Sequence, residues 1–260
     1  MHTSRGLLSL GAALAVSALM SRPGAGADMV FRSSAGGTSL LELFSSEGCS
    51  SCPPADALVS SLRTSSGLWR DFVPAVFHVD YWDYLGWRDV LASPVFTRRQ
   101  QDYGRLATPE FVLNGRVWYP GGSAEVPKPA ADAGELEVRP EGLLCYHIAF
   151  HAKGGGRWRA HAALLGFDIV DAIPAGENAG RTLRHDFVAL GYQSEPLVGG
   201  AATITVKSNL AAKPERFAVA VWVTREGDPT PVQAAGGLMG QPHLKGKMSL
   251  SPRRESDGSP

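Results

Sequence analysis

One stretch constrains the fold of this chain more than any other. The apolar run Leu40–Phe44, which has the length of a strand, leads into a polar turn that contains Cys49 and Cys52. Pro53 and Pro54 follow at once. Proline is favoured in the first turn of a helix, where its missing N–H would have no partner anyway. The pattern therefore predicts a buried strand, a turn with two cysteines spaced C-x-x-C, and a helix that begins at the second cysteine.

The position of the two cysteines predicts thiol chemistry. Unpaired N–H groups and the positive end of a helix stabilise a thiolate, so a cysteine there has a depressed pKa. We expect Cys49 to be the exposed nucleophile and Cys52 the resolving thiol. Two alternatives stay open. The same spacing serves zinc, although the third cysteine, Cys145, lies far away without a partner at zinc-ligand spacing. The pair could also be an inert structural disulfide.

Glu42 interrupts the apolar run and is a second candidate catalytic residue. A carboxylate in a buried strand is costly unless it is paired or protonated, and burial raises its pKa. Near a dithiol, such a group could relay the proton of the second cysteine. The alternative is that Glu42 faces solvent or a structural partner.

The N-terminus has the pattern of a cleavable export signal. Arg5, the apolar run 7–20 and the small residues Ala25–Ala27 form its three regions, and we expect cleavage near Ala27. The mature chain is then periplasmic or secreted, without a membrane anchor, because no later segment is long and apolar enough. The chain has 25 basic and 25 acidic residues, a balance that argues against nucleic acid as a partner.

After the cysteines, the pattern predicts a βαβ unit. Residues 55–68 have apolar side chains at helical spacing, and residues 74–80 read as a second strand, parallel to the first. The densest aromatic segment, 81–89, comes at the carboxyl end of that strand, where ligands collect in open α/β sheets. Tyr81 and Trp82 could therefore form a platform for substrate beside the cysteines. They could equally cover the core beneath a long loop.

Histidines raise two weaker hypotheses of a metal site. His78 and Asp80 could bind a metal together with the cysteines, but a satisfied structural histidine is the favoured interpretation. His147, His151 and His161 fall in strand-like segments and could gather on neighbouring strands. No acid or cysteine joins them by sequence, so a solvated face is favoured there. We predict no metal site.

A second helix and a hairpin complete the first half of the chain. Ser93-Pro94 begins a helical pattern over residues 95–106. Asn114-Gly115 between two apolar runs is a strong signal for a two-residue hairpin. Pro109 opens the first strand of that hairpin, a position where a cis peptide bond is plausible.

These motifs carry a resemblance to a known family. The order strand, C-x-x-C, helix, strand, helix, Thr-Pro and hairpin is similar to the thioredoxin fold. The segments LELFSSEGCSSCPPAD, FHVDYWDYLGW, SPVFTRRQ and TPEFVLNGR resemble an exported, thioredoxin-like family of bacterial proteins without a settled function, over residues 40–119. The resemblance implies that Pro109 is cis and lies against the dithiol, and that Thr108 contacts substrate through its backbone. It also implies a last helix within 121–137.

The resemblance extends to a motif in the second half of the chain. GENAGRTLRHDFV, residues 176–188, is similar to a motif in the C-terminal part of that family. It implies that Glu177, Asn178 and Arg181 form a polar loop packed against the first domain.

The remaining sequence predicts a second, β-rich domain. Short apolar runs separated by glycine-rich turns favour an antiparallel sandwich. Cys145 falls in one such run, where we expect it to be buried rather than a second redox partner. The predicted fold class is an α/β thioredoxin-like domain followed by a smaller β-rich, sandwich-like C-terminal domain. The predicted organisation is a signal peptide (1–27), a loose leader (28–38), the thioredoxin-like domain (39–137), the β-rich domain (138–244) and a disordered tail (245–260).

The sequence thus predicts an exported thiol–disulfide oxidoreductase that acts on protein or small-molecule thiols and disulfides. It needs no organic cofactor, since no glycine loop that could bind phosphate is present. One alternative is a non-enzymatic periplasmic binding module or metal chaperone that uses Cys49, Cys52 and His78. Another is a scaffold whose cysteines only close the turn. The predicted site consists of catalytic Cys49, Cys52 and Glu42, and substrate-binding Thr108, Pro109, Tyr81 and Trp82.

Overall fold

The computed structural model describes residues 29–121, 125–129, 133–208 and 212–240. The predicted signal peptide and C-terminal tail lie outside these residues. Within them, no helix combines the length and the apolar character needed to cross a membrane.

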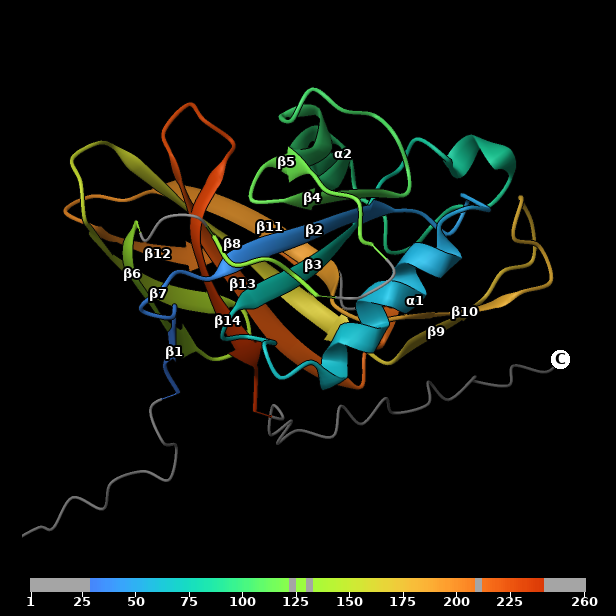
Figure 1. The fold of residues 1–260 in the computed structure, drawn as a ribbon. Coiled ribbons are helices and arrows are strands. Elements are labelled where there is room, and N and C mark those ends of the chain that lie inside the picture. The colour runs from blue at the N-terminus through green and yellow to red at the C-terminus, as the bar shows by residue number, and fades with distance from the viewer. Residues whose placement is uncertain (1–28, 122–124, 130–132, 209–211, 241–260) are drawn as a thin grey trace, which may run out of the picture.

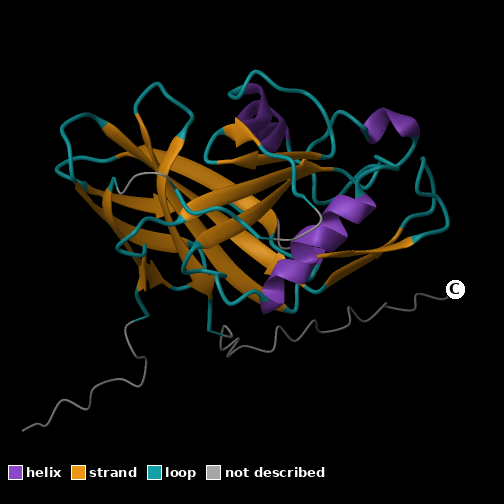
Figure 2. Ribbon diagram, viewed as in Figure 1, coloured by secondary structure: helices purple, strands orange, loops and turns teal. Residues whose placement is uncertain are grey.

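More of the described residues lie in strands than in helices (Figure 2). The helices are α1 (Pro53–Ser61) and α2 (Pro94–Gln101), with short 3₁₀ turns η1 (Leu62–Thr64) and η2 (Asp83–Leu85). The strands are β1 (Phe31–Arg32), β2 (Ser39–Ser45), β3 (Phe72–His78), β4 (Glu110–Leu113), β5 (Arg116–Val117), β6 (Gly134–Glu141), β7 (Cys145–Ala152), β8 (Trp158–Phe167), β9 (Ile169–Ala172), β10 (Thr182–His185), β11 (Val188–Pro196), β12 (Ala201–Thr205), β13 (Arg216–Arg225) and β14 (Pro231–Leu238).

The predicted α/β thioredoxin-like fold is wrong. The described strands form three sheets, an eight-stranded sheet in the order β14-β13-β8-β11-β3-β2-β4-β5, a four-stranded sheet β1-β6-β7-β12, and the pair β10-β9. Only β2–β3 and β3–β11 pair in parallel. The last helix expected within 121–137 is absent from the described parts of that segment, and β6 begins at Gly134. Strands from the second half of the chain extend the sheet, where an α/β fold would place further helices.

Several local predictions are confirmed. All seven residues of β2 are buried, as expected for a central strand next to a parallel neighbour. Helix α1 begins at Pro53, directly after Cys52. The hairpin β4–β5 turns at Asn114 and Gly115, which have φ of 47° and 79°, as a turn that needs two left-handed residues requires. Short-range signals therefore predicted the elements of residues 39–117 well, although they did not predict the fold around them.

One sheet crosses the boundary expected at residue 137. Val188 of β11 pairs in parallel with Val76 of β3, and β8, β13 and β14 continue the sheet in antiparallel order. The predicted loose leader also contains a strand, because Phe31 of β1 lies opposite Val138 of β6. The apolar core is correspondingly continuous, from β2 and β3 to β8 and β13.

The two faces of β2 and β3 carry different helices (Figure 1). Successive side chains of a strand point to opposite faces, so Glu42 and Ser45 of β2 lie on opposite sides of the sheet. Ser45 bonds to Asp56 of α1, and Glu42 bonds to Arg99 of α2. His78 of β3 is in register with Ser45 and shares its face. We call these two sides the α1 face and the α2 face.

Candidate functional site

The two cysteines form a disulfide at the start of α1. Their Cα atoms are 5.4 Å apart, and Cys52 is the N-cap residue of the helix. The turn that presents them is closed by two backbone hydrogen bonds, from Cys49 N–H to Ser46 O and from Cys52 N–H to Cys49 O, both 3.2 Å. The chain thus positions the pair where β2 ends and α1 begins, as the sequence predicted.

The helix end offers fewer free donors than expected. Pro53 and Pro54 have no N–H, and the N–H groups of Ala55 and Asp56 both donate to the Cys52 carbonyl. The hydroxyl of Ser51 lies 3.4 Å from Cys49 Sγ. A thiolate at Cys49 would therefore be stabilised by the helix dipole and this hydroxyl.

Both cysteines are buried, Cys49 at 2% exposure and Cys52 at 0%. The expected exposure of Cys49 is not found in this disulfide form. Ser50 and Ser51, between the two cysteines, are exposed. An attacking thiol can therefore reach the neighbouring backbone but not the sulfurs themselves.

A loop from the second half of the chain, residues 174–181, is tied to the disulfide turn. Asn178 is fully buried, and its Nδ2 donates to the carbonyls of Glu47 (2.8 Å) and Cys49 (3.0 Å). Ser50 N–H donates to Glu177 Oε2 (3.1 Å), and Arg181 donates to Asn178 Oδ1 (2.6 Å). These contacts confirm the polar loop implied by the 176–188 motif.

Two of the four predicted substrate-binding residues meet beside the turn. Trp82 Nε1 donates to Thr108 Oγ1 at 2.8 Å, and the Thr108–Pro109 peptide bond is cis. A Cβ at Gly48 would lie 2.8 Å from Trp82 Cβ, so only glycine fits in the turn at this position. Tyr81 instead donates to Gln100 of α2 (3.1 Å). The structure therefore brings Trp82 against the disulfide turn and Thr108 against Trp82, while Tyr81 also bonds to α2.

Glu42 lies on the α2 face, away from α1. It is fully buried and accepts bonds from Arg99 (2.9 and 3.3 Å) and from the hydroxyl of Tyr103 (2.5 Å). Burial lowers the pKa of Arg99, but Glu42, together with Tyr103 and Tyr192, raises that pKa overall, so the guanidinium keeps its charge. These contacts match the structural-partner alternative for Glu42 rather than a proton relay to the cysteines.

The α1 face holds a buried polar cluster that the sequence did not single out. Asp56 of α1, His78 of β3 and His185 of β10 each offer a ligand atom, and these atoms lie within 4.8 Å of one another. The side chain of His78 is 0% exposed, that of His185 is 2% exposed, and Asp56 is 7% exposed. The two imidazole rings are 5.0 Å apart at nearly a right angle. We call these three residues the Asp-His-His cluster.

Each member of the Asp-His-His cluster has an outer partner. Ser45 donates to Asp56 Oδ2 (3.0 Å), and Asp89 Oδ2 lies 2.7 Å from His78 Nδ1. On the other side, Glu47 Oε1 lies 3.2 Å from His185 Nε2. Glu47 is in turn held by Trp87 Nε1 (2.7 Å), and Asp89 by two backbone N–H groups. The inner atoms of the cluster are therefore oriented by a second layer of bonds.

Burial and neighbouring charges shift the pKa values of this region. Burial raises the pKa of Asp56, against the opposing effect of His78 and His185. Burial lowers the pKa of His78, but Asp89, together with Asp56 and Glu47, raises that pKa overall to about 9. For Asp89 burial acts to raise the pKa, and His78 lowers it overall. The Asp89–His78 contact is thus an ion pair at neutral pH.

Each member of the Asp-His-His cluster lies in or near a sequence motif that was noted, although no motif contains all three residues. His78 was considered as a metal ligand with Asp80, which instead accepts a bond from Thr97 (2.5 Å). Asp56 follows Cys52 by four residues, and His185 lies within the 176–188 motif. Nothing local joins the two, because β10 was not predicted and 129 residues separate them along the chain.

The other histidines do not gather. His147 is exposed and bonds to Glu141 and Thr203, His151 is exposed, and His161 is buried on the α2 face. Cys145 is half-buried rather than buried, and its Sγ lies 3.9 Å from Glu141 Oε2.

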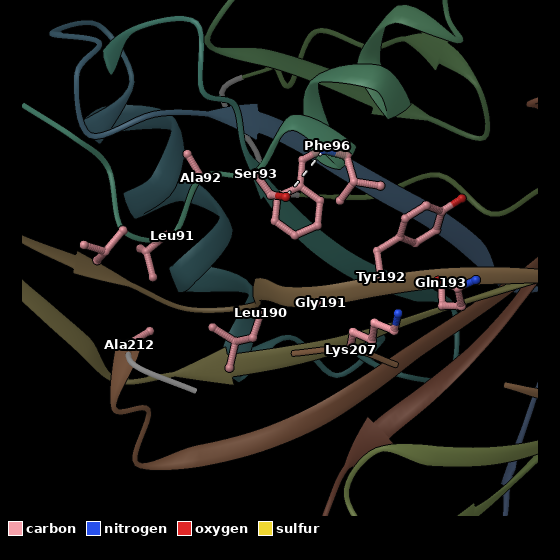
Figure 3. A pocket seen from close by; sticks show the side chains of 12 residues that line it. Leu91, Ala92, Ser93, Phe96, Leu190, Gly191, Tyr192, Gln193, Lys207 and Ala212 are labelled. Atoms are coloured by element: carbon pink, nitrogen blue, oxygen red, sulfur yellow. Dashed lines mark hydrogen bonds between the residues drawn. The ribbon is translucent and has the colours of Figure 1, made fainter. Parts of the chain in front are cut away.

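A cavity of about 370 Å³ lies between the α2 segment and β11 (Figure 3). Phe96, Leu190 and Tyr192 form part of its apolar wall, and Lys207 adds a charge. None of its lining residues belongs to the disulfide turn or to the Asp-His-His cluster.

Comparisons with known proteins give a family but no activity. Residues 40–224, more than half of the chain, match the family described as "Protein of unknown function (DUF1223)". A search of curated proteins found no match. Among solved structures, the chain is similar to protein AGR_C_4864 from Agrobacterium tumefaciens, with 26% identity over 80% of this chain and 97% of that one, and a TM-score of 0.54. It also shares its fold with HBP35 of Porphyromonas gingivalis, at 13% identity over 86% and 81% of the two chains, with a TM-score of 0.54.

Proposed function

We propose that this chain, which belongs to the DUF1223 family of proteins of unknown function, is an exported thiol–disulfide oxidoreductase that acts through Cys49 and Cys52. One observation carries the proposal. The cysteines are bonded to each other across a separation of three residues, at the N-terminal end of a helix. That is the position at which a helix dipole stabilises the thiolate released when the disulfide opens.

The size of the closed loop argues against a purely structural role. A disulfide stabilises a fold mainly by restricting the unfolded chain, and the effect grows with loop length. For a loop of about four residues the chain-entropy model gives only about 2 kcal/mol. The turn is also held by Asn178 and by its own backbone bonds, so its shape does not depend on the disulfide alone.

The proposed reaction is a two-electron exchange. A substrate thiolate attacks Cys49 Sγ, the Cys49–Cys52 bond breaks, and its electron pair leaves on Cys52 as a thiolate. A second substrate thiolate then attacks the substrate sulfur of the mixed disulfide and releases Cys49. The substrate dithiol becomes a disulfide, and the two protons it loses are balanced by those that the protein dithiol takes up. Reduction of a substrate disulfide follows the same steps in reverse.

Access to the sulfurs requires the 174–181 loop to move. Asn178 and Glu177 hold the disulfide turn through three hydrogen bonds, and Cys49 is 2% exposed while they are made. Trp82 packs against Gly48 of the turn and bonds to Thr108, which precedes the cis Pro109, and we propose that a substrate backbone binds along these residues after the loop opens. Glu42 takes no part, since it is paired with Arg99 on the opposite face.

The test is a redox titration of the purified mature protein against glutathione buffers of defined ratio. We expect a two-electron midpoint, trapped mixed disulfides with Cys52→Ser, and none with Cys49→Ser. Cys145→Ser is the control and should titrate like the natural protein. A disulfide that stays intact at strongly reducing ratios until the protein unfolds would contradict the proposal.

A second variant tests access. Asn178→Ala removes two hydrogen bonds that hold the turn, each worth about 1 kcal/mol, so reduction by dithiothreitol should become at least about tenfold faster. The midpoint potential should change little, because the loop is proposed to control access. An unchanged rate of reduction would show that the 174–181 loop does not limit access of dithiothreitol to the disulfide.

The alternative of a metal chaperone that uses Cys49, Cys52 and His78 needs both sulfurs as thiolates. In the disulfide form neither sulfur is available as a ligand. The titration separates this alternative from the proposal, because thiolate ligands would bind metal only at reducing ratios.

A further inference from the structure

Among the buried polar atoms of the described residues that have no hydrogen-bond partner, three belong to the Asp-His-His cluster. They are Asp56 Oδ1, His78 Nε2 and His185 Nδ1, one from each member of the Asp-His-His cluster. A buried polar atom without a partner costs on the order of 1–3 kcal/mol. Three such atoms in one cluster, each on a side chain that is firmly held at its other end, point to a ligand that satisfies them together.

The charge of the region favours a cation. Four carboxyl groups surround the two imidazoles, from Asp56, Glu47, Asp89 and Asp171. These four carboxyl groups outnumber the two imidazoles. A divalent cation would offset that excess.

We propose that Asp56, His78 and His185 bind a divalent transition-metal ion, with Zn²⁺ as the best match. Two imidazole nitrogens and one carboxylate oxygen are a common ligand set for zinc and for related first-row ions. Magnesium and calcium prefer sites built from oxygen atoms.

The geometry requires only a small contraction. Metal–ligand distances of 2.0–2.2 Å in a tetrahedral site place ligand atoms roughly 3.4 Å from one another. The ligand atoms here are within 4.8 Å of one another, so the longest separation needs to shorten by about 1.4 Å at most. Side chains from α1, β3 and β10 can make this movement without a change in the strands.

The outer bonds are those that a metal site needs. Imidazole ligands in metal sites almost always donate their second nitrogen to a carboxylate or carbonyl, which orients the ring and strengthens the ligand. His78 has Asp89 at its second nitrogen, and His185 has Glu47. Ser45 holds the second oxygen of Asp56. All three inner atoms are thus left without another partner, and on binding a metal His78 would release its Nε2 proton, because an imidazole ligand is neutral.

The position of the site indicates what the metal does. The ligands are almost fully buried, and the three protein groups leave one position of a tetrahedral zinc ion for a fourth ligand. The site joins α1 and β3 to β10, which comes from the second half of the chain and otherwise pairs only with β9 among the described strands. The metal would therefore fix β10 and the adjoining 174–181 loop against the disulfide turn. This inference does not depend on redox activity of the cysteines.

The experiment measures binding of the metal alone. Purified mature protein is stripped with a chelator and titrated with Zn²⁺ by calorimetry, and Co²⁺ is added separately for its absorption spectrum. We expect one ion per chain and a Co²⁺ spectrum of nitrogen and oxygen ligands without a thiolate charge-transfer band. Asp56→Asn and His185→Gln should weaken binding at least tenfold, and Glu47→Gln by about 10- to 100-fold through the orientation of His185.

Two controls make the result specific. His147→Gln removes an exposed histidine that also has an acidic neighbour, and it should bind like the natural protein. The double variant Cys49→Ser, Cys52→Ser should keep one tight site. Circular dichroism checks that each variant folds, and the Co²⁺ spectrum of the natural protein gives an answer even if a variant does not.

Three outcomes would overturn the inference. They are no binding of Zn²⁺ or Co²⁺ at micromolar concentration, binding that Asp56→Asn and His185→Gln leave unchanged, and binding that is lost with the two cysteines. Loss of binding with the two cysteines would favour the metal chaperone that uses thiolate ligands. The proposed redox function would then be judged by the glutathione titration alone.

Discussion

Two buried polar clusters lie on opposite faces of β2 and β3, and they are satisfied in different ways. On the α2 face, Glu42 and Arg99 pair within hydrogen-bond distance, and both nitrogens of His161 are bonded, to Tyr192 (2.7 Å) and Thr224 (3.0 Å). On the α1 face, the Asp-His-His cluster leaves three atoms unpaired.

The cluster on the α2 face is built as part of the core. The rings of His161 and Trp222 stack 5.2 Å apart, and the Arg99 guanidinium lies 5.2 Å from the Trp222 ring. One polar atom there, Trp222 Nε1, has no hydrogen-bond partner among the described residues. Such a cluster holds the sheet to α2 and needs nothing from outside.

Comparison of the two clusters shows which feature distinguishes a buried polar cluster that stabilises the fold from one that binds a ligand. Both clusters contain buried histidines and acids, so composition and burial do not distinguish them. What differs is whether the unpaired atoms converge on a common point. A self-contained network stabilises a fold, whereas convergent unpaired atoms indicate a binding site.

The largest expected effect comes from breaking the α2-face ion pair. Arg99→Met leaves Glu42 buried without its charge partner, which should lower the free energy of unfolding by about 3–5 kcal/mol. Urea denaturation measures this. Arg98→Met, one residue earlier on the exposed side of α2, is the control and should stay within about 0.5 kcal/mol of the natural protein. An equal effect of both would mean that the Glu42–Arg99 pair is not a stabilising unit.

The next largest effect is stabilisation of the folded protein by Zn²⁺ bound on the α1 face. Zn²⁺ at 100 times its dissociation constant should raise the free energy of unfolding by about 2.7 kcal/mol, because it binds the folded state alone. The same gain is expected with His161→Phe, whose histidine lies on the other face, and none with Asp56→Asn. Thermal unfolding with and without a chelator gives the comparison. A gain that persists in Asp56→Asn would place the metal elsewhere.

Reduction of the disulfide should have a smaller effect. The loop closed by Cys49 and Cys52 is short, so dithiothreitol should lower the free energy of unfolding by no more than about 2 kcal/mol, and the reduced protein should stay folded. Urea denaturation of the oxidised and reduced forms measures the difference. Global unfolding on reduction would instead identify the disulfide as a structural requirement.

The smallest effect is a pH dependence from His161. Burial, and then the charge of Arg99, lower its pKa well below the usual value, so the folded protein holds this ring neutral. The unfolded chain binds a proton at about pH 6.5, so the stability that the neutral ring contributes is present above that pH. It is lost as the pH falls, by up to about 1.4 kcal/mol per unit. His161→Phe should flatten the slope of unfolding free energy between pH 6.5 and 5. An identical slope in both proteins would exclude His161 as its source.

Much of the first half of the chain could be predicted from short-range signals. Pro53 and Pro54 predicted the start of α1, Asn114-Gly115 predicted the β4–β5 turn, and the apolar run from Leu40 predicted a buried strand. Each depends on backbone preferences within a few residues. The fold class was predicted wrongly, because β11 pairs with β3 over more than a hundred residues of chain, and no local pattern encodes that pairing.

The residues of the candidate site also fall into two groups, those that local motifs predict and those that they do not. Cys49 and Cys52 were found because their spacing is local, and Trp82 and Thr108 because they belong to recognisable motifs. His185 was missed, because its partners Asp56 and Glu47 are distant in sequence and its strand is short. Glu42 was assigned to the cysteines by its nearness in the chain, although alternation along β2 directs it to the other face.

The order of strand, cysteine turn and helix over residues 40–61 is encoded locally, because each element depends on residues that follow one another directly in the chain. The tertiary structure alone decided which polar groups meet: Glu42 with Arg99 on one face, and Asp56 with His78 and His185 on the other. The physical reason is that a buried polar group is stabilised by the atoms around it in space. Those atoms come from strands whose pairing is set by the packing of the whole sheet.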